Sequence, residues 1–116
     1  MLSPGGNIKI YLFTGYTDMR KGAKTLAYLA QNILSACELT EKMFVFRGKS
    51  ADKIKVLWWD GQGYCLFYKN FDRGKFIWHV SERQGSLSIT RAQFSMLIEG
   101  IDWRMPNWTQ PPEYAG

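Results

Sequence analysis

The chain has 116 residues, which is enough for one hydrophobic core and too few for two ordinary domains. Its apolar fraction of 46% is normal for a globular protein and excludes disorder over most of the chain. Fifteen Lys and Arg residues oppose ten Asp and Glu residues, so the net charge is +5 at pH 7. This balance favours an anionic partner such as nucleic acid, although a charge of this size also serves solubility alone.

The N-terminal third of the chain predicts a strand followed by a helix. Residues 1–7 are expected to form a flexible start and Ile8–Phe13 a first strand. Thr17 or Asp18 is suited to cap a helix. Apolar side chains then recur every three or four residues, as on one buried helical stripe, at Met19, Ala23, Leu26, Ala30, Ile33 and Leu34. We therefore expect a long helix near residues 18–36.

Short strands are expected through the middle of the chain. They are Met43–Arg47, Lys53–Trp59 and Tyr64–Lys69, with a fourth near Lys75–Val80 and a last short one at Leu87–Ile89. The first connections between them are short and rich in Gly, Asp and Asn, which favours antiparallel hairpins. The middle of the chain therefore predicts a β-meander.

The C-terminal region predicts a short helix and a tail. Thr90 and Gln93 have the spacing of a capping box, and Gly100 is suited to end a helix near residues 91–99. The Pro-rich residues 105–116 are expected to be flexible.

Together the elements predict one α+β domain over residues 8–104. Its expected architecture is an antiparallel β-meander of four to six strands with one long N-terminal helix and one short C-terminal helix.

The central hairpin predicts which side chains share a face of the sheet. With Gly61 and Gln62 in the turn, the cross-strand pairs are Trp59 with Tyr64, Leu57 with Leu66, and Lys55 with Tyr68. Matching the apolar positions sets Phe44 and Phe46 beside Val56 and Ile54, on a core face shared with Trp58, Cys65 and Phe67. The opposite face then gathers Arg47, Lys53 and Lys55 with Tyr64, Tyr68 and Trp59.

Such a basic and aromatic face has two interpretations. Lysines that contact phosphates, with aromatic platforms beside them, are a recurrent way to bind a nucleic acid strand. Alternatively the lysines are solvated and the aromatic rings lie under the helix or at a dimer interface.

No catalytic or metal-binding constellation is expected. His79 is the single histidine and stands in an aromatic strand, where a packed residue is expected rather than a base. Asp52, Asp60 and Asp72 fall in turns, where aspartate has a structural purpose. Asp102 has no obvious local task other than pairing with a neighbouring arginine. We therefore predict no cofactor and no metal, and the enzymatic alternative is a metal-dependent nuclease that uses Asp18, Asp60 or Asp102.

The cysteines and the apolar runs bear on the cellular compartment. Cys37 and Cys65 are 28 positions apart without further Cys or His ligands nearby, so we expect two free thiols rather than a zinc site. Lys9 interrupts the early apolar run, so no signal peptide is expected. No uncharged stretch approaches the roughly 18 residues of a membrane span. A cytoplasmic protein without a membrane partner is predicted.

Three stretches of the sequence resemble one protein family. They are Thr14–Gly22 (TGYTDMRKG), a run from Phe44 through Asp60-Gly61-Gln62-Gly63 to Trp78, and Leu97–Arg104 (LIEGIDWR). In this order and spacing they resemble the TnpB family, accessory proteins from the second reading frame of the bacterial insertion sequences numbered sixty-six. The resemblance covers about residues 8–104.

The resemblance implies an accessory factor that acts in transposition beside a separate, larger transposase, which has the acidic catalytic residues. It assigns no catalytic or DNA-contacting residue. Its motif residues are candidates for function and for turn structure alike, and they are Asp18, Arg20, Arg47, Gly48, Asp60, Gly61, Gly63, Arg73, Gly74 and Arg104.

The sequence therefore predicts a non-enzymatic factor that binds element DNA, the transposase, or both. The alternative is a pure protein-interaction module that docks the transposase without DNA contact, and homo-oligomer formation is left open. The candidate nucleic-acid-binding residues are Arg20, Lys21, Arg47, Lys49, Lys53, Lys55, Lys69, Arg73, Lys75 and Arg104.

Overall fold

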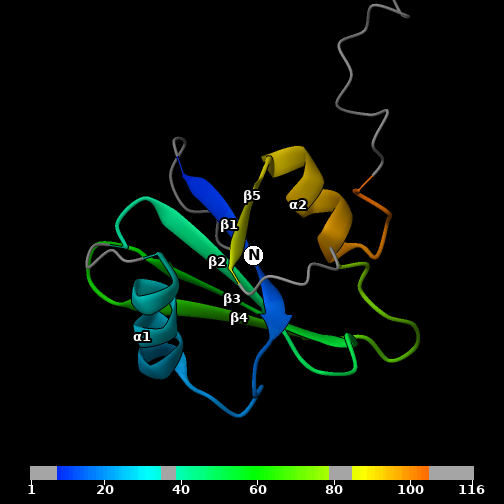
Figure 1. The fold of residues 1–116 in the computed structure, drawn as a ribbon, viewed down its shortest axis with the longest axis horizontal. Coiled ribbons are helices and arrows are strands. Elements are labelled where there is room, and N and C mark those ends of the chain that lie inside the picture. Colours follow the sequence, from blue (N-terminus) through cyan, green and yellow to red (C-terminus); the bar gives the residue numbers. More distant parts are fainter. Residues whose placement is uncertain (1–7, 35–38, 79–84, 105–116) are drawn as a thin grey trace, which may run out of the picture.

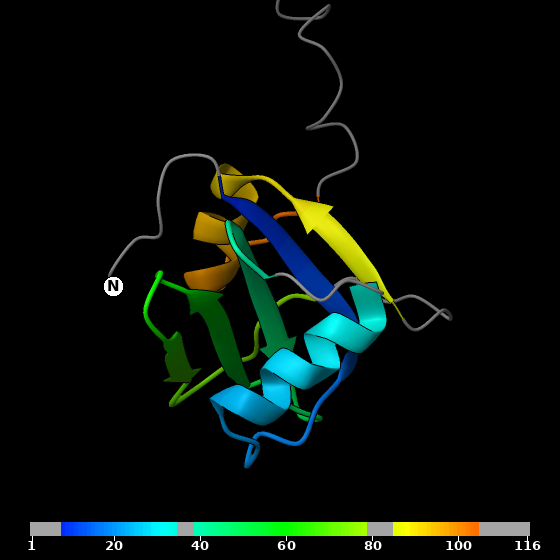
Figure 2. The same cartoon turned by 90° about the vertical axis from the view of Figure 1, so that its left-hand side faces the viewer.

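The computed structural model describes residues 8–34, 39–78 and 85–104. Its elements are β1 (Lys9–Tyr16), α1 (Ala23–Leu34), β2 (Lys42–Arg47), β3 (Lys53–Trp59), β4 (Tyr64–Asn70), β5 (Ser86–Ile89) and α2 (Arg91–Ile98). The strands form one five-stranded sheet in the order β4-β3-β2-β1-β5. The two helices lie on opposite faces of this sheet (Figures 1 and 2). The predicted flexible segments 1–7 and 105–116 lie outside the described residues.

The predicted antiparallel meander is wrong, because the sheet is mixed. β1 and β2 pair in parallel, with Ile10 opposite Met43 and Leu12 opposite Val45, whereas the other three pairings are antiparallel. A parallel pair needs a long crossover, and the segment that contains α1 supplies it between β1 and β2. The protein is therefore mostly β, with a small helical part.

The predicted long helix near residues 18–36 is also wrong. The described helix α1 has 12 residues and begins at Ala23, after a turn in which the Lys21 amide donates to the Asp18 carbonyl at 3.1 Å. Asp18 accepts the Arg20 amide at 2.9 Å and so closes a turn instead of capping the helix. The glycine at position 22, which was expected inside the helix, precedes it, as its poor helix propensity favours.

Each face of the sheet has its own hydrophobic core. Under α2 the sheet residues Leu12, Val45 and Val56 pack with Phe94 and Leu97 of the helix. Under α1 a smaller cluster joins three aromatic side chains of β1 and β2 to the helix residues Leu26, Ala27 and Ala30; these three are Phe13, Phe44 and Phe46. Burial of both faces explains why β2 reads as a continuous apolar run rather than an alternating one.

The strand predicted near Lys75–Val80 is absent over its described part, residues 75–78. Phe76 and Trp78 instead leave the sheet and fill the core under α2, where they are 3% and 6% exposed. The last predicted strand does form, as β5, and it pairs with β1 rather than extending the hairpins.

The predicted register of the central hairpin is confirmed, but that of its neighbour is wrong. Trp59 pairs with Tyr64, and Lys55 pairs with Tyr68. Between β2 and β3, however, Val45 lies opposite Val56, which moves Phe44 and Phe46 to the face of α1. A slip of one residue changes the face of every side chain on a strand, so it also moves Arg47 away from Lys55.

The C-terminal helix matches its prediction. Thr90 accepts the Gln93 amide at 3.0 Å, and the Gln93 side chain accepts the Thr90 amide at 2.9 Å, which completes the capping box. Gly100 follows the helix with φ +78°, a conformation that glycine adopts without strain.

Candidate nucleic-acid interface

The strand directions bring nine of the ten predicted site residues to one end of the sheet. β1, β2 and β4 finish there and β3 begins there, and Figure 1 shows the β2–β3 turn and the chain after β4 beside the arrowhead of β1. We define the basic end as residues 16–21, 47–55 and 69–75. These segments contain nine Lys or Arg residues and three Asp residues, a surplus of six positive charges in a chain whose net charge is +5.

Arg47 lies between two aromatic rings at the basic end. Its Cζ atom is 6.0 Å from the ring centroid of Tyr16 and 5.8 Å from that of Trp78. The Trp78 indole is fixed in turn, because its Nε1 donates to the Phe13 carbonyl at 2.9 Å. These distances are within the range of cation–π attraction, so the guanidinium is held by rings rather than by a carboxylate.

The guanidinium of Arg47 is incompletely satisfied. Its Nε atom is buried and has no hydrogen-bond partner among the described residues, and Nη1 makes one long contact of 3.4 Å with the Gly48 carbonyl. Burial of the guanidinium lowers the pKa of Arg47 below its ordinary value. The predicted grouping of Arg47 with Lys53 and Lys55 is wrong, since Arg47 lies opposite Ile54 on the face of α2.

Lys49 extends the same cluster from the β2–β3 turn. Its Nζ atom is 5.8 Å from the centroid of the Tyr16 ring, which is 59% exposed. The turn is held by backbone hydrogen bonds from Gly48 to Lys53 and from Ala51 to Gly48, at 2.9 and 3.1 Å. Two cations therefore lie close to the Tyr16 ring: Arg47 from the end of β2 and Lys49 from the β2–β3 turn.

Two of the predicted lysines are anchored to the fold. Lys55 donates to the Lys21 carbonyl at 2.8 Å and so connects β3 to the approach of α1. Lys69 donates to the Ile98 carbonyl at 2.7 Å and connects β4 to the end of α2. Each also lies near a ring, of Tyr68 and Phe71 respectively. These contacts give both lysines a structural role.

Three further candidates are paired with carboxylates close to them in sequence. Arg20 pairs with Asp18 at 2.8 Å, Lys53 with Asp52 at 3.3 Å, and Arg104 with Asp102 at 3.1 Å. The hydrogen bonds and charge of the partner arginine hold the pKa of Asp18 and of Asp102 below its usual range. Arg20 and Lys21, predicted in the first turn of a helix, lie in the turn before α1 instead.

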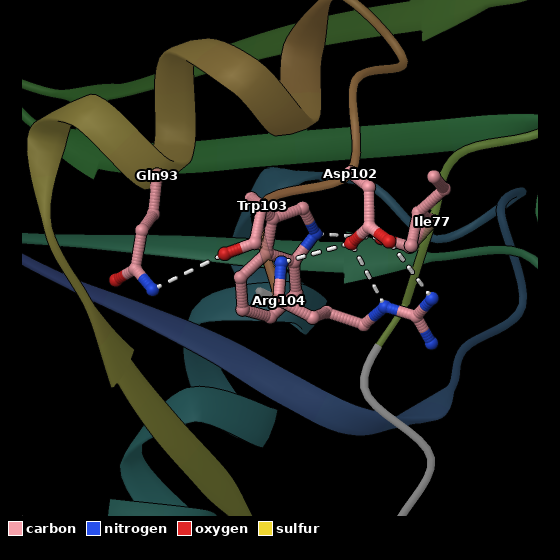
Figure 3. A network of polar contacts seen from close by, with 5 residues as sticks. All are labelled: Ile77, Gln93, Asp102, Trp103 and Arg104. Atoms are coloured by element: carbon pink, nitrogen blue, oxygen red, sulfur yellow. Dashed lines mark hydrogen bonds and ion pairs between the residues drawn. The ribbon is translucent and has the colours of Figure 1, made fainter. Parts of the chain in front are cut away.

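Arg104, the tenth candidate, lies outside the basic end as defined, and the contacts of its neighbour Trp103 fix its position. The Trp103 indole donates to the Ile77 carbonyl at 2.7 Å, and the Trp103 carbonyl accepts a 3.4 Å hydrogen bond from the Gln93 side chain (Figure 3). Trp103 is 3% exposed, so this residue of the Leu97–Arg104 motif has a structural role.

The remaining candidates are Lys21, Arg73 and Lys75, and none of them pairs with a carboxylate of the described residues. Arg73 and Lys75 are exposed. Lys21 lies at the rim of an open cavity of about 460 Å³, whose apolar lining includes Phe13 and Leu29. The sequence reasoning missed this cavity, and it also missed Tyr16 and Trp78 as the rings that hold Arg47.

The acidic residues of the nuclease alternative are each engaged in local contacts. Asp18 and Asp102 pair with arginines, and Asp60 accepts the backbone amides of Gln62 and Gly63 at 2.8 and 2.9 Å. Within residues 8–34, 39–78 and 85–104, no three His, Cys, Asp or Glu side chains are placed to hold a metal ion.

The predicted free thiol of Cys65 is confirmed. Burial, and then the contact with the Asp60 carboxylate, raises the pKa of this thiol. Cys37 and His79 lie outside the described residues. Neither helix in the described part of the chain is long and apolar enough to cross a membrane.

The described residues thus form a small, mostly β domain with a mixed five-stranded sheet, one end of which is basic and aromatic. The chain belongs to the family described as IS66 Orf2 like protein, whose model matches residues 8–108. This membership confirms the predicted family and gives the chain a role in the transposition of an insertion sequence, among the accessory proteins of the element's transposition machinery.

Two relatives come from Sinorhizobium fredii (strain NBRC 101917 / NGR234). The uncharacterized protein y4hO is 47% identical over the full length of both chains. The uncharacterized protein y4jC is 34% identical over 89% of this chain and 87% of its own. No solved structure matches the chain.

Proposed function

We propose that the chain is a non-enzymatic accessory factor of transposition that binds element DNA through the basic end of its sheet. The observation that supports this function is the charge asymmetry of the fold. The basic end has a surplus of six positive charges, so the rest of the chain has a net charge of −1. A concentrated field of this kind attracts a polyanion and orients it on one surface.

The contacts within the basic end divide its cations by role. Arg20 and Lys53 are partly neutralised by carboxylates, and Lys55 and Lys69 hold elements of the fold together. The cations that remain for phosphates are Arg47, Lys49, Lys21, Arg73 and Lys75. We expect these to determine the salt dependence of binding, because each phosphate contact releases counterions.

The test is a salt titration of binding to a duplex from the element end. Replacing Lys49 and Arg73 together by Ala should reduce the slope of log affinity against log salt by about 1.8, at about 0.9 per phosphate contact. The matched control is the double variant Lys9→Ala and Arg91→Ala, because both residues are exposed and lie at the opposite end of the sheet. Its slope should equal that of the native protein. No binding at about 50 mM salt, or equal slopes for all three proteins, would contradict DNA binding through this end.

The alternative function, docking of the transposase without DNA contact, is favoured by the outer strand β4. β4 is an edge of the sheet, and its side chains Leu66 and Tyr68 share a face and are 36% and 49% exposed. An edge strand with exposed apolar side chains is a template for another chain.

A pull-down of the native protein and of Leu66→Lys with the transposase of the same element, with and without terminal DNA, separates the two functions. Capture that needs Leu66 and is independent of DNA would favour docking. Capture that requires DNA would favour the proposed function.

Such a factor acts in the cytoplasm, where element DNA and transposase meet.

A further inference from the structure

We infer that Tyr16, Arg47 and Lys49 form a subsite for an unpaired nucleotide of single-stranded DNA. In this subsite the base stacks on the Tyr16 ring, and the adjoining phosphate is bound by Arg47 and Lys49. The inference rests on the proposed function and adds the form of DNA that the basic end recognises.

The Tyr16 ring is available for stacking. It is 59% exposed, although it lies at the end of a strand whose preceding residues are mostly buried. The charged atoms of Arg47 and Lys49 lie over this ring at 6.0 and 5.8 Å from its centroid, at the outer limit of cation–π contact, so neither is in van der Waals contact with the ring centre. An exposed ring flanked by cations is the arrangement with which proteins bind a base and its phosphate together.

The backbone of Tyr16 and Arg47 and the side chain of Arg47 are held in place by the fold. Tyr16 is paired with Arg47 in the parallel ladder, and the next amide, of Thr17, donates to the Arg47 carbonyl at 2.8 Å. The indole of Trp78 packs beside the guanidinium on its other side, at 5.8 Å. Binding a nucleotide here therefore requires little new ordering of the backbone, which favours affinity.

Arg47 is the cation at the basic end that most needs an anion. Arg20 has a carboxylate partner, and Lys69 has a short hydrogen bond to a backbone carbonyl. Arg47 has a buried Nε without a partner and one contact of 3.4 Å among the described residues. A partly buried guanidinium that lacks hydrogen-bond acceptors is unfavourable, and a phosphate oxygen within reach of its N–H groups would supply one.

The geometry favours an unpaired base over a duplex. In a duplex the faces of the bases are covered by the neighbouring bases, so the Tyr16 ring has no free base face on which to stack. In a single strand every base has a free face, and stacking on one aromatic side chain contributes substantially to affinity. The basic end should therefore discriminate between the two forms through Tyr16, whereas its other cations contact phosphates of either form.

The experiment compares a 15-nucleotide single strand with the duplex of the same sequence by fluorescence anisotropy, using the full chain. Tyr16→Ala should weaken single-strand binding by about 5- to 150-fold. Its duplex affinity should remain within about two-fold, since no stacking is lost there. Tyr16→Phe, which keeps the ring, should bind both probes as the native protein does. Tyr28→Ala is the matched control, because Tyr28 is 63% exposed on α1.

The outcomes separate this inference from the proposed function. Duplex binding that depends on salt, combined with equal effects of Tyr16→Ala on both probes, would overturn the nucleotide subsite and leave the DNA-binding function in place. Absence of binding to both probes at about 50 mM salt would overturn both. Loss of binding by Tyr16→Phe as well would show that the hydroxyl, not the stacking face, makes the contact, and would also overturn the inference.

Discussion

The two ends of the sheet use similar residues in different ways. At the end where β3 turns into β4, polar side chains bond to the backbone beside them, as Asp60 does with Gln62 and Gly63. At the basic end, Arg47 and Lys49 lie beside aromatic rings and have no carboxylate partner among the described residues. Asp60 is thus satisfied within its own turn, whereas Arg47 and Lys49 keep charges that an external anion can satisfy. Proximity to a turn therefore does not by itself decide whether a polar side chain is satisfied within the fold.

The largest difference between the ends should appear when their tryptophans are replaced. Trp78→Ala should lower the free energy of unfolding by about 3–5 kcal/mol, because it empties a buried site and removes the hydrogen bond to the Phe13 carbonyl. Trp59→Ala, at a half-buried position of the opposite end, should cost clearly less. Denaturant unfolding followed by circular dichroism gives both values. Equal losses would contradict the deeper burial of Trp78, whose ring packs beside Arg47.

A glycine in each turn provides the second comparison. A Cβ atom at Gly48 would lie 2.9 Å from Cγ of Met19, whereas one at Gly63 would have no atom within 4 Å. Gly48→Ala should therefore destabilise the protein by about 1–3 kcal/mol through overpacking. Gly63→Ala should be neutral or stabilising, by up to about 1 kcal/mol, because it reduces the entropy of the unfolded chain. The pair is compared by thermal unfolding, and a harmless Gly48→Ala would contradict the close packing of the β1–α1 segment on this turn.

Lys69 tests whether an anchored cation is distinct from a DNA-binding one. Lys69→Met keeps most of the aliphatic stem and removes the 2.7 Å hydrogen bond to the Ile98 carbonyl. It should lower stability by about 1 kcal/mol, the usual contribution of such a bond. The salt dependence of DNA binding should stay as in the native protein. If Lys69→Met has native stability and its DNA binding depends less on salt, then Lys69 contacts a phosphate and does not serve as an anchor of the fold.

The smallest effect is expected at Asp60, at the opposite end. Backbone hydrogen bonds from Gln62 and Gly63 lower the pKa of Asp60 in the folded protein. Because the pKa of this carboxyl group is lower in the folded protein than in the unfolded chain, its ionised form stabilises the fold at any pH above the unfolded pKa of about 3.9. This contribution is lost as the pH falls through the pKa of the folded protein. Asp60→Asn should therefore have a slightly lower melting temperature than the native protein at pH 7, and the difference should close below about pH 4. A difference that is independent of pH would exclude the charge as its cause.

Elements with local signals were predicted correctly from the sequence. The Thr90–Gln93 capping box and the β3–β4 register depend on residues within a few positions of each other, and both form as predicted. The predicted start of the N-terminal helix was wrong because apolar side chains already recur at helical spacing from Met19, within the turn that precedes α1. Met19 does pack on the core under α1, but from outside the helix.

The sequence by itself determined the number and place of most strands, the short C-terminal helix and the family. Only the tertiary structure decided that β1 and β2 run parallel, that Phe76 and Trp78 leave the sheet, and that Arg47 lies between two rings. The physical reason is that both faces of the sheet are buried. When apolar side chains point to both sides of β2, alternation cannot choose between registers one residue apart. The packing of two helices on opposite faces makes that choice, and with it the composition of the basic end.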